Sequence, residues 1–371
     1  MPTVKLSMEC WTFGHCPPAS RSRDGRGYLV LKQGEGSGRI RFRVRDRDRG
    51  KLVGWHMNIT TKMLALLTLL LCLPALADAA KATSPKGKDT PSFAQILSES
   101  KGSEWRRPEP ENLLVMRLPA GRLVMELAPD YAPLHVANIR TLVRERYFDG
   151  LAIVRVQDNF VAQWDDPQGD DGGDKRKMRS LGSAKTTLPP EFTRSIASSL
   201  PWVRLPDGDV YAPEVGFAGD FPAARDPAAN ETWLVHCYGT LAISRDNPPD
   251  SGNGSGLYVA IGQPPRRLDR NLTIVGRVVE GIEQLSALPR GHGPLGFYAD
   301  PKHRTPILDI RVAADLQPAQ QPNIEILRTN SPTFQRLLDA FRNRHDAFYA
   351  TSPGKVDICA VAAPVRDVAH P

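Results

Sequence analysis

One arginine and two side chains close to it form the arrangement in this sequence with the clearest chemical potential. Arg155 lies in a short apolar segment between Val154 and Val156, and Phe160 and Gln163 follow on a second apolar segment. A guanidinium among apolar side chains is costly to bury without a partner. Arg155 is therefore either a structural ion-pair residue or a hydrogen-bond donor that points into a cleft.

The surrounding sequence predicts the elements that position these residues. Pro119-Ala120-Gly121 separates two apolar segments, which is typical of a hairpin. Pro133 suits the first turn of a helix whose apolar residues recur at helical spacing as far as about Arg146. A second helix is expected from about Gly281 to about Ala287. The expected strands are Leu113–Leu118, Arg122–Leu127, Leu151–Val156, Phe160–Gln163, Gly239–Ser244, Leu257–Ile261, Thr273–Val278 and Pro306–Val312. Many short strands with two good helices predict a mainly β fold, an antiparallel barrel capped by helices.

Three sequence blocks occur in an order that is typical of one family. APDYAPLHVANIRTLVRERYFDG resembles APxTVxNFxxLxxxGYYDG, and FDGLAIVRVQDNFVAQWDDP resembles YYDGLxFHRVIxxFMxQGGD. The third, GTLAISR…SGNGSGLYVAIG…RRLDRNLTIVGRVVEGIEQL, resembles GxLSMA…SxGSQFFI…WLDxxxxVFGxVxEGMxVV, and LPPEF is similar to IxxEF. These are motifs of the cyclophilin family of peptidyl-prolyl isomerases. The resemblance covers about Leu113 to Val312 and implies a cyclophilin-like eight-stranded antiparallel barrel capped by two helices.

The resemblance also implies a chemistry, in which an outer groove grips a proline-containing polypeptide. Rotation about the prolyl amide bond breaks its resonance and crosses a barrier of about 18–20 kcal/mol. A cation that donates to the prolyl nitrogen binds the twisted amide better than either planar isomer. Arg155 aligns with the catalytic arginine of the family, and its fork of donors suits the role better than lysine would. No nucleophile, base, metal, nucleotide or other cofactor is required.

The same alignment assigns the residues around the arginine. Phe160 would floor the proline pocket, and Gln163 would hold the substrate carbonyl or orient the Arg155 guanidinium. The walls of the pocket would be Val161, Tyr258, Leu268 and Leu272.

Several positions depart from the family pattern. Val154 replaces a histidine, Gly256 a glutamine, and Arg267 stands where a tryptophan is common. The other departures are Trp164, Asp165, Ser244, Arg245 and Leu257. The retained groove residues favour an isomerase, whereas the departures favour a non-catalytic peptide-binding or chaperone module. A third hypothesis is that the chain is a scaffold protein that uses its long insertion as an interaction surface. The arginine at 267 argues against binding of cyclosporin-like ligands.

The charge of the chain points away from nucleic acid. The formal net charge is +7, and residues 1–56 carry twelve Lys and Arg against five Asp and Glu, which is the whole excess. The sequence after residue 79 is neutral. An acidic partner would therefore have to bind the first 56 residues alone, and no nucleic-acid partner is expected.

Residues 57–79 have the layout of a secretory signal peptide. Lys62 precedes an apolar stretch from Leu64 to Leu73, and small-x-small sites at Ala75–Ala77 and Ala77–Ala79 follow it. The stretch is too short to span a bilayer. We expect an exported, periplasmic protein without stable membrane insertion after cleavage, in which residues 1–56 are a non-native or disordered extension. The alternative is an unusual internal apolar segment.

Two cysteines remain outside these N-terminal segments, Cys237 and Cys359. An exported compartment is oxidising, which favours a disulfide between them over two buried thiols. No CxxC motif is present, and the aspartates from Asp165 to Asp174 lack the spacing of a calcium loop. No metal site is expected.

The remaining segments suggest how the chain is divided. We expect a linker over 80–110 with at most one short helix near Phe93–Leu97, a barrel domain over 111–316, and a C-terminal extension over 317–371. An insertion at about 165–235 is predicted to be irregular. Ser331-Pro332 opens a helix with an apolar face, Phe334, Leu337, Leu338 and Phe341, and Lys355–Val361 is expected to be a strand. That helix face packs on the barrel or receives a client or a second subunit. We favour packing and a monomer.

Overall fold

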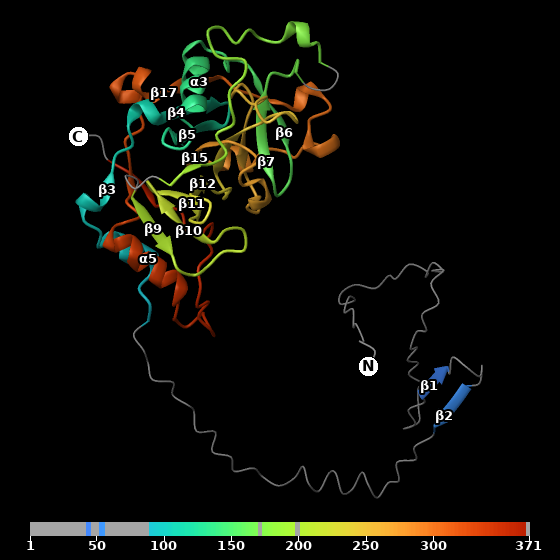
Figure 1. The fold of residues 1–371 in the computed structure, drawn as a ribbon, viewed down its shortest axis with the longest axis vertical. Helices are drawn as coiled ribbons and strands as arrows, with labels where there is room; N and C mark the ends of the chain where they lie inside the picture. The colour runs from blue at the N-terminus through green and yellow to red at the C-terminus, as the bar shows by residue number, and fades with distance from the viewer. Residues whose placement is uncertain (1–41, 46–51, 56–88, 170–172, 197–200, 369–371) are drawn as a thin grey trace, which may run out of the picture. The chain divides into compact units, whose positions relative to one another are not determined.

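The computed structural model describes residues 42–45, 52–55, 89–169, 173–196 and 201–368 (Figure 1). The predicted signal peptide and most of the predicted N-terminal extension lie outside these ranges. Residues 1–85 form a unit of their own, whose described part is the antiparallel pair β1 (Phe42–Arg45) and β2 (Leu52–Trp55). No helix in the described ranges is long and apolar enough to cross a membrane.

The second unit is built around one curled antiparallel sheet with the strand order β16-β6-β7-β14-β13-β15-β5-β4-β17. Its strands are β4 (Leu113–Leu118), β5 (Gly121–Leu127), β6 (Ala152–Val156), β7 (Val161–Asp165), β13 (Thr240–Ile243), β14 (Leu257–Ala260), β15 (Ile274–Glu280), β16 (Thr305–Pro306) and β17 (Asp309–Val312). Every predicted strand of the barrel is confirmed within a few residues at each end.

A single segment closes this sheet into a barrel. β16 pairs with β6 at one edge, and β17 pairs with β4 at the other. The two residues between them bond to opposite edges, since Ile307 N donates to Leu151 O at 2.8 Å and Leu308 N donates to Arg117 O at 2.9 Å. Residues 305–312 thus act as the eighth strand, and the predicted eight-stranded barrel is confirmed.

Side chains alternate between the inside and the outside of the barrel, as the period of a strand requires. On β4, Leu114 and Met116 enter the main core, whereas Leu113 and Val115 face outward. α3 (Pro133–Arg144) adds its apolar face, including Ile139 and Leu142, to the same core. α4 (Glu283–Ser286) is a single turn.

The sequence predicted an irregular insertion, and this prediction is wrong for the second half of the segment. The second half of the insertion forms a five-stranded antiparallel sheet in the order β8-β12-β11-β10-β9. The strands are β8 (Arg194–Ser195), β9 (Trp202–Leu205), β10 (Glu214–Ala218), β11 (Phe221–Asp226) and β12 (Glu231–Leu234). Gly219 and Asp220, with φ of 54° and 70°, make the tight turn between β10 and β11. Short strands that contain Pro222 and several alanines hide the pattern in the sequence.

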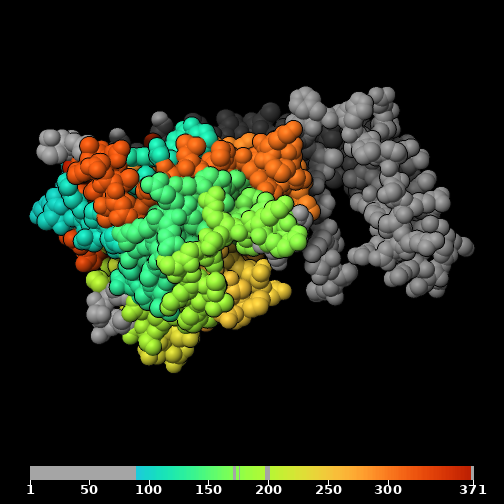
Figure 2. Space-filling model, turned by 90° about the horizontal axis from the view of Figure 1, so that it is seen from above, coloured from blue at the N-terminus to red at the C-terminus, as the bar shows by residue number. Residues whose placement is uncertain are grey.

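The first half of the insertion lacks regular strands and packs against α3. Glu191 accepts hydrogen bonds from the backbone N–H groups of Leu134 and His135, at 3.1 and 3.0 Å, in the first turn of α3. Asn138 Oδ1 accepts from Lys185 N at 2.8 Å. In Figure 2 the yellow-green residues of the insertion lie against the teal residues of this region.

The inserted sheet has two apolar faces. Ala218, Ala223 and Leu234 belong to a cluster with outward-facing residues of the barrel. Their neighbours in sequence, such as Phe217 and Trp233, face a second core on the opposite side. The inserted sheet is therefore a layer between the barrel and the rest of the chain.

The C-terminal extension covers the second face of this layer. α5 (Pro332–Arg342) begins after Ser331, whose Oγ accepts from Phe334 N at 3.1 Å, as the sequence predicted. The Phe334 ring meets Phe217 edge to face, with centroids 5.0 Å apart. The apolar face of α5 thus packs within the chain, but on the inserted sheet and not on the barrel as predicted.

The N-terminal end of this unit joins the same layer, which corrects the linker prediction. α2 (Phe93–Ser98) is the predicted short helix, and Phe93 stacks on Phe341 of α5. β3 (Trp105–Arg106) pairs with β18 (Ile324–Leu327), which also pairs with β19 (Val365–Asp367). The strand predicted at Lys355–Val361 is wrong, because that segment buries Val356, Ile358 and Val361 without joining a sheet.

Candidate functional site

Arg155 lies on the outer face of the barrel. The register of β6 against β7 shifts after Ile153, which pairs Arg155 with Gln163. The neighbours of Gln163 on β7, Ala162 and Trp164, point into the barrel core. Gln163 and its partner Arg155 therefore face outward, where a peptide can reach them.

Three neutral oxygen atoms hold the Arg155 guanidinium. Its Nε donates to Leu295 O at 2.7 Å, one Nη donates to Gln163 Oε1 at 3.2 Å, and the other donates to Gln157 Oε1. Burial lowers the pKa of Arg155 below its ordinary value, but an arginine stays protonated in proteins. No carboxylate of the described residues forms an ion pair with it, so its charge stays available to a bound group. Of the two predicted roles of Gln163, the structure shows the contact with Arg155.

Phe160 lies beside two cations. The Arg155 Cζ is 5.5 Å from the ring centroid of Phe160, and the Arg267 Cζ is 5.1 Å from it. The ring of Phe297 lies 5.4 Å from Arg155 as well. The predicted pocket floor is therefore a half-buried aromatic ring beside two guanidinium groups.

The predicted wall residues are only partly brought together. Val161, Tyr258 and Leu272 share one apolar cluster with Phe160. Leu268 is half-buried and does not belong to any apolar cluster of the described residues. Ala218, Ala223 and Leu234 of the inserted sheet belong to the first cluster too, and Val161 and Tyr258 are only 2% and 4% exposed. The insertion thus covers this side, whereas Arg155, Phe160 and Gln163 remain half-buried.

Gly256 replaces the glutamine of the third motif block, and the sequence therefore predicted the loss of a polar substrate contact there. A Cβ atom at this position would collide with Asp165 Oδ2 and Ser244 Oγ. Ser244 Oγ donates to Asp165 Oδ2 at 3.3 Å. The departures at these three positions therefore fit one another, since a carboxylate and a hydroxyl fill the space that a side chain at 256 would take.

Comparisons with known proteins agree with this geometry. Residues 113–312 match the family described as cyclophilin type peptidyl-prolyl cis-trans isomerase/CLD. This chain belongs to the cyclophilin family. A probable peptidyl-prolyl cis-trans isomerase of Brucella suis is 30% identical over 186 residues, which are 49% of this chain and 74% of that protein.

Two further proteins from other organisms are similar to this cyclophilin. The crystal structure of the cyclophilin AquaCyp293 from Hirschia baltica matches with a TM-score of 0.57 and 25% identity, over 74% of this chain and 97% of that one. A putative thylakoid lumen peptidyl-prolyl cis-trans isomerase of Synechocystis is 25% identical over 43% of this chain and 39% of its own length.

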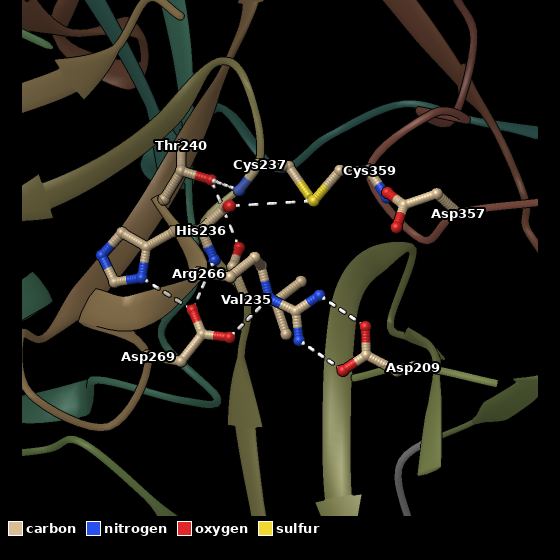
Figure 3. The surroundings of a disulfide bond; sticks show 9 residues. All are labelled: Asp209, Val235, His236, Cys237, Thr240, Arg266, Asp269, Asp357 and Cys359. Atoms are coloured by element: carbon tan, nitrogen blue, oxygen red, sulfur yellow. Dashed lines mark hydrogen bonds and ion pairs between the residues drawn. A yellow bond between two sulfur atoms is a disulfide. The ribbon is translucent and has the colours of Figure 1, made fainter. Parts of the chain in front are cut away.

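A buried polar network, which sequence reasoning missed, fixes the Tyr258 wall of the cyclophilin groove. His236 Nε2 lies 2.8 Å from the Tyr258 hydroxyl, and His236 Nδ1 lies 2.9 Å from Asp269 Oδ1. Arg266 Nε donates to Asp269 Oδ2 at 2.6 Å, and its two Nη groups donate to the Asp209 carboxylate, each at 2.9 Å (Figure 3). Burial, and then the charge of Asp269, raise the pKa of Tyr258, which keeps its hydroxyl protonated. Of the members of this network, only Tyr258 was predicted from the sequence to lie at the groove.

The structure also joins Cys237 to Cys359 in a disulfide across 122 residues of sequence (Figure 3). Cys237 follows His236 directly, so the disulfide lies beside the network that holds Tyr258. No group of three or more His, Cys, Asp and Glu side chains in the described ranges is arranged to hold a metal ion. A cavity of about 310 Å³ lies elsewhere, where Arg106, Glu126, Tyr131 and Phe221 are among its lining residues, and it shares no residue with the groove.

Proposed function

We propose that this cyclophilin isomerises Xaa-Pro bonds of exported proteins while they fold in the periplasm. The observation that carries the proposal is the Arg155 guanidinium, which faces outward and is held only by neutral acceptors. The positive charge of Arg155 can therefore interact with a bound substrate.

The proposed mechanism needs only hydrogen bonding. A proline ring against Phe160 would bring its amide nitrogen toward Arg155. As the C–N bond twists, resonance is lost and the nitrogen becomes pyramidal and basic, so it accepts a hydrogen bond that a planar amide nitrogen cannot. An interaction made only in the twisted state lowers the barrier without tightening the binding of either planar isomer. Gln157, Gln163 and the Leu295 carbonyl support this role by fixing the guanidinium in advance.

The second candidate is a peptide-binding module with little catalysis. It is favoured by the inserted sheet, which buries Val161 and Tyr258 and so narrows the proline pocket. A protease-coupled isomerisation assay on an Ala-Pro peptide separates the two, with the chain started at Ala80. A rate above the uncatalysed one supports the isomerase. A rate equal to it, with the peptide still bound, supports the module.

The compartment in the proposal is the periplasm. It is supported by the signal-like layout of residues 57–79 and by the Cys237–Cys359 disulfide, because disulfides persist in oxidising compartments. Fusing residues 57–90 to a reporter enzyme that is active only outside the cytoplasm tests it. An inactive reporter would refute the periplasmic location, whatever the isomerase assay shows.

A further inference from the structure

Arg267 lies at the groove but takes no part in the proposed bond rotation. It is exposed, and its guanidinium lies over the same Phe160 ring that would receive the proline. Carboxylate and phosphate groups match the fork of donors that an exposed guanidinium presents. The position of Arg267 therefore bears on which peptides this groove selects.

No carboxylate of the described residues forms an ion pair with Arg267. The acidic side chains nearby have partners of their own: Asp269 binds Arg266 and His236, and Asp158 binds Arg290 Nε at 3.0 Å. The only ring contact of Arg267 in the described ranges is with Phe160. Its charge is therefore unpaired at the mouth of the groove, beside the equally unpaired Arg155.

Asp165 is a further acidic residue on β7, and it lies far along the strand from Phe160. Asp165 faces the same side of β7 as Val161, the neighbour of Phe160, and lies four residues further on. At about 3.3 Å per residue, the two positions are about 13 Å apart. That exceeds the screening length of about 8 Å at physiological salt. Asp165 is therefore not expected to neutralise the positive charge beside Phe160.

We propose that Arg267 makes this groove selective for peptides with a glutamate or aspartate directly beside the proline. The inference rests on the proposed function, since it places the proline against Phe160. Consecutive Cα atoms are 3.8 Å apart. A side chain next to a proline on the Phe160 ring therefore starts within reach of a guanidinium 5.1 Å from the ring centroid.

The test uses the full chain and four short peptides. Ala-Glu-Pro-Ala and Ala-Pro-Glu-Ala are each compared with their glutamine counterparts, and cis–trans exchange is measured by NMR. We expect a glutamate-to-glutamine rate ratio of about fivefold at one of the two positions, the upper end for an exposed ion pair. The ratio should fall as salt rises from about 0.05 to 0.5 M, because salt screens exposed charges.

Three variants tie the selectivity to one side chain. Arg267→Gln should bring the ratio to about one, and Arg267→Lys, which keeps the charge, should preserve most of it. Arg328→Gln removes one charge from an exposed arginine outside the groove and should leave the ratio unchanged. The salt dependence is measured on the unaltered chain, so the test holds even if an Arg267 variant folds poorly.

The failures of the two proposals can be told apart. If the chain isomerises the glutamine peptides and the ratio is one at both positions, the selectivity is refuted while the isomerase stands. A ratio that survives in Arg267→Gln also refutes it. If no peptide is isomerised, the isomerase proposal fails. Binding constants of the same peptides are then measured by calorimetry, and their glutamate-to-glutamine ratio decides whether the groove is selective.

Discussion

Replacing Arg155 with alanine tests the proposed mechanism most directly. The guanidinium makes three hydrogen bonds to neutral acceptors and none of its charge is neutralised by a carboxylate in the described residues. A hydrogen bond to a charged group contributes about 1.5–3 kcal/mol net. If that interaction exists only in the twisted state, its loss lowers kcat/KM by about 10- to 150-fold, since 1.36 kcal/mol is a factor of ten. The fall should appear in kcat, with KM little changed.

Arg155→Lys sharpens the same test. Lysine keeps the charge but cannot reach the Leu295, Gln163 and Gln157 oxygens with one rigid fork, so we expect it to lose most of the activity too. Arg328→Ala is the control for the loss of an exposed arginine. Both kinetic constants are read from the protease-coupled assay over a range of peptide concentrations. An Arg155→Ala rate within twofold of the unaltered chain would refute the assigned role.

Three further outcomes follow from other parts of the structure. Cys359→Ser removes a disulfide that closes a 122-residue separation, and chain entropy predicts a loss of up to about 4.9 kcal/mol in the free energy of unfolding; a loss under about 1 kcal/mol by urea titration would contradict this. Gly256→Gln, which restores the family residue, should lower rather than raise kcat/KM, because its side chain collides with that of Asp165; a faster variant would show that the space can open. The hydrogen bonds from Arg342 lower the pKa of Asp207, so the stability they give is complete above about pH 4, the ordinary aspartate value, and is lost as pH falls below it. Unfolding free energies of Asp207→Asn and of the unaltered chain should therefore converge in acid, and parallel curves from pH 7 to 2 would refute the assignment.

The barrel was predictable because its strands are short apolar segments bounded by recognisable turns. β4 and β5 flank Pro119-Ala120-Gly121, and the apolar face of α3 begins at Pro133. Local sequence alone carries these signals. The inserted sheet was not predictable in the same way, since polar, proline and small residues such as Arg204, Pro222 and Ala223 interrupt the apolar segments of its strands.

The residues of the groove were likewise predictable from the sequence only in part. Arg155 was found because a charge inside an apolar strand is conspicuous in the sequence. The His236–Asp269–Arg266 network was not found, because its members gain meaning only when the fold brings residues 209, 236, 258 and 269 together. The Asp165–Ser244 pair beside Gly256 was likewise missed, since compensation between distant positions leaves no local pattern.

The sheet that joins β3, β18 and β19 cannot form until nearly the whole chain has been synthesised. Trp105 and Leu327 are neighbours in that sheet, although more than two hundred residues of sequence separate them. The barrel strands are all made by residue 312, whereas Phe217 and Trp233 stay uncovered until α5 arrives. A newly made chain therefore passes through a stage in which a finished barrel carries an apolar sheet without its cover. Such a surface promotes aggregation, and versions of the chain that end near residue 316 would be held permanently at that stage.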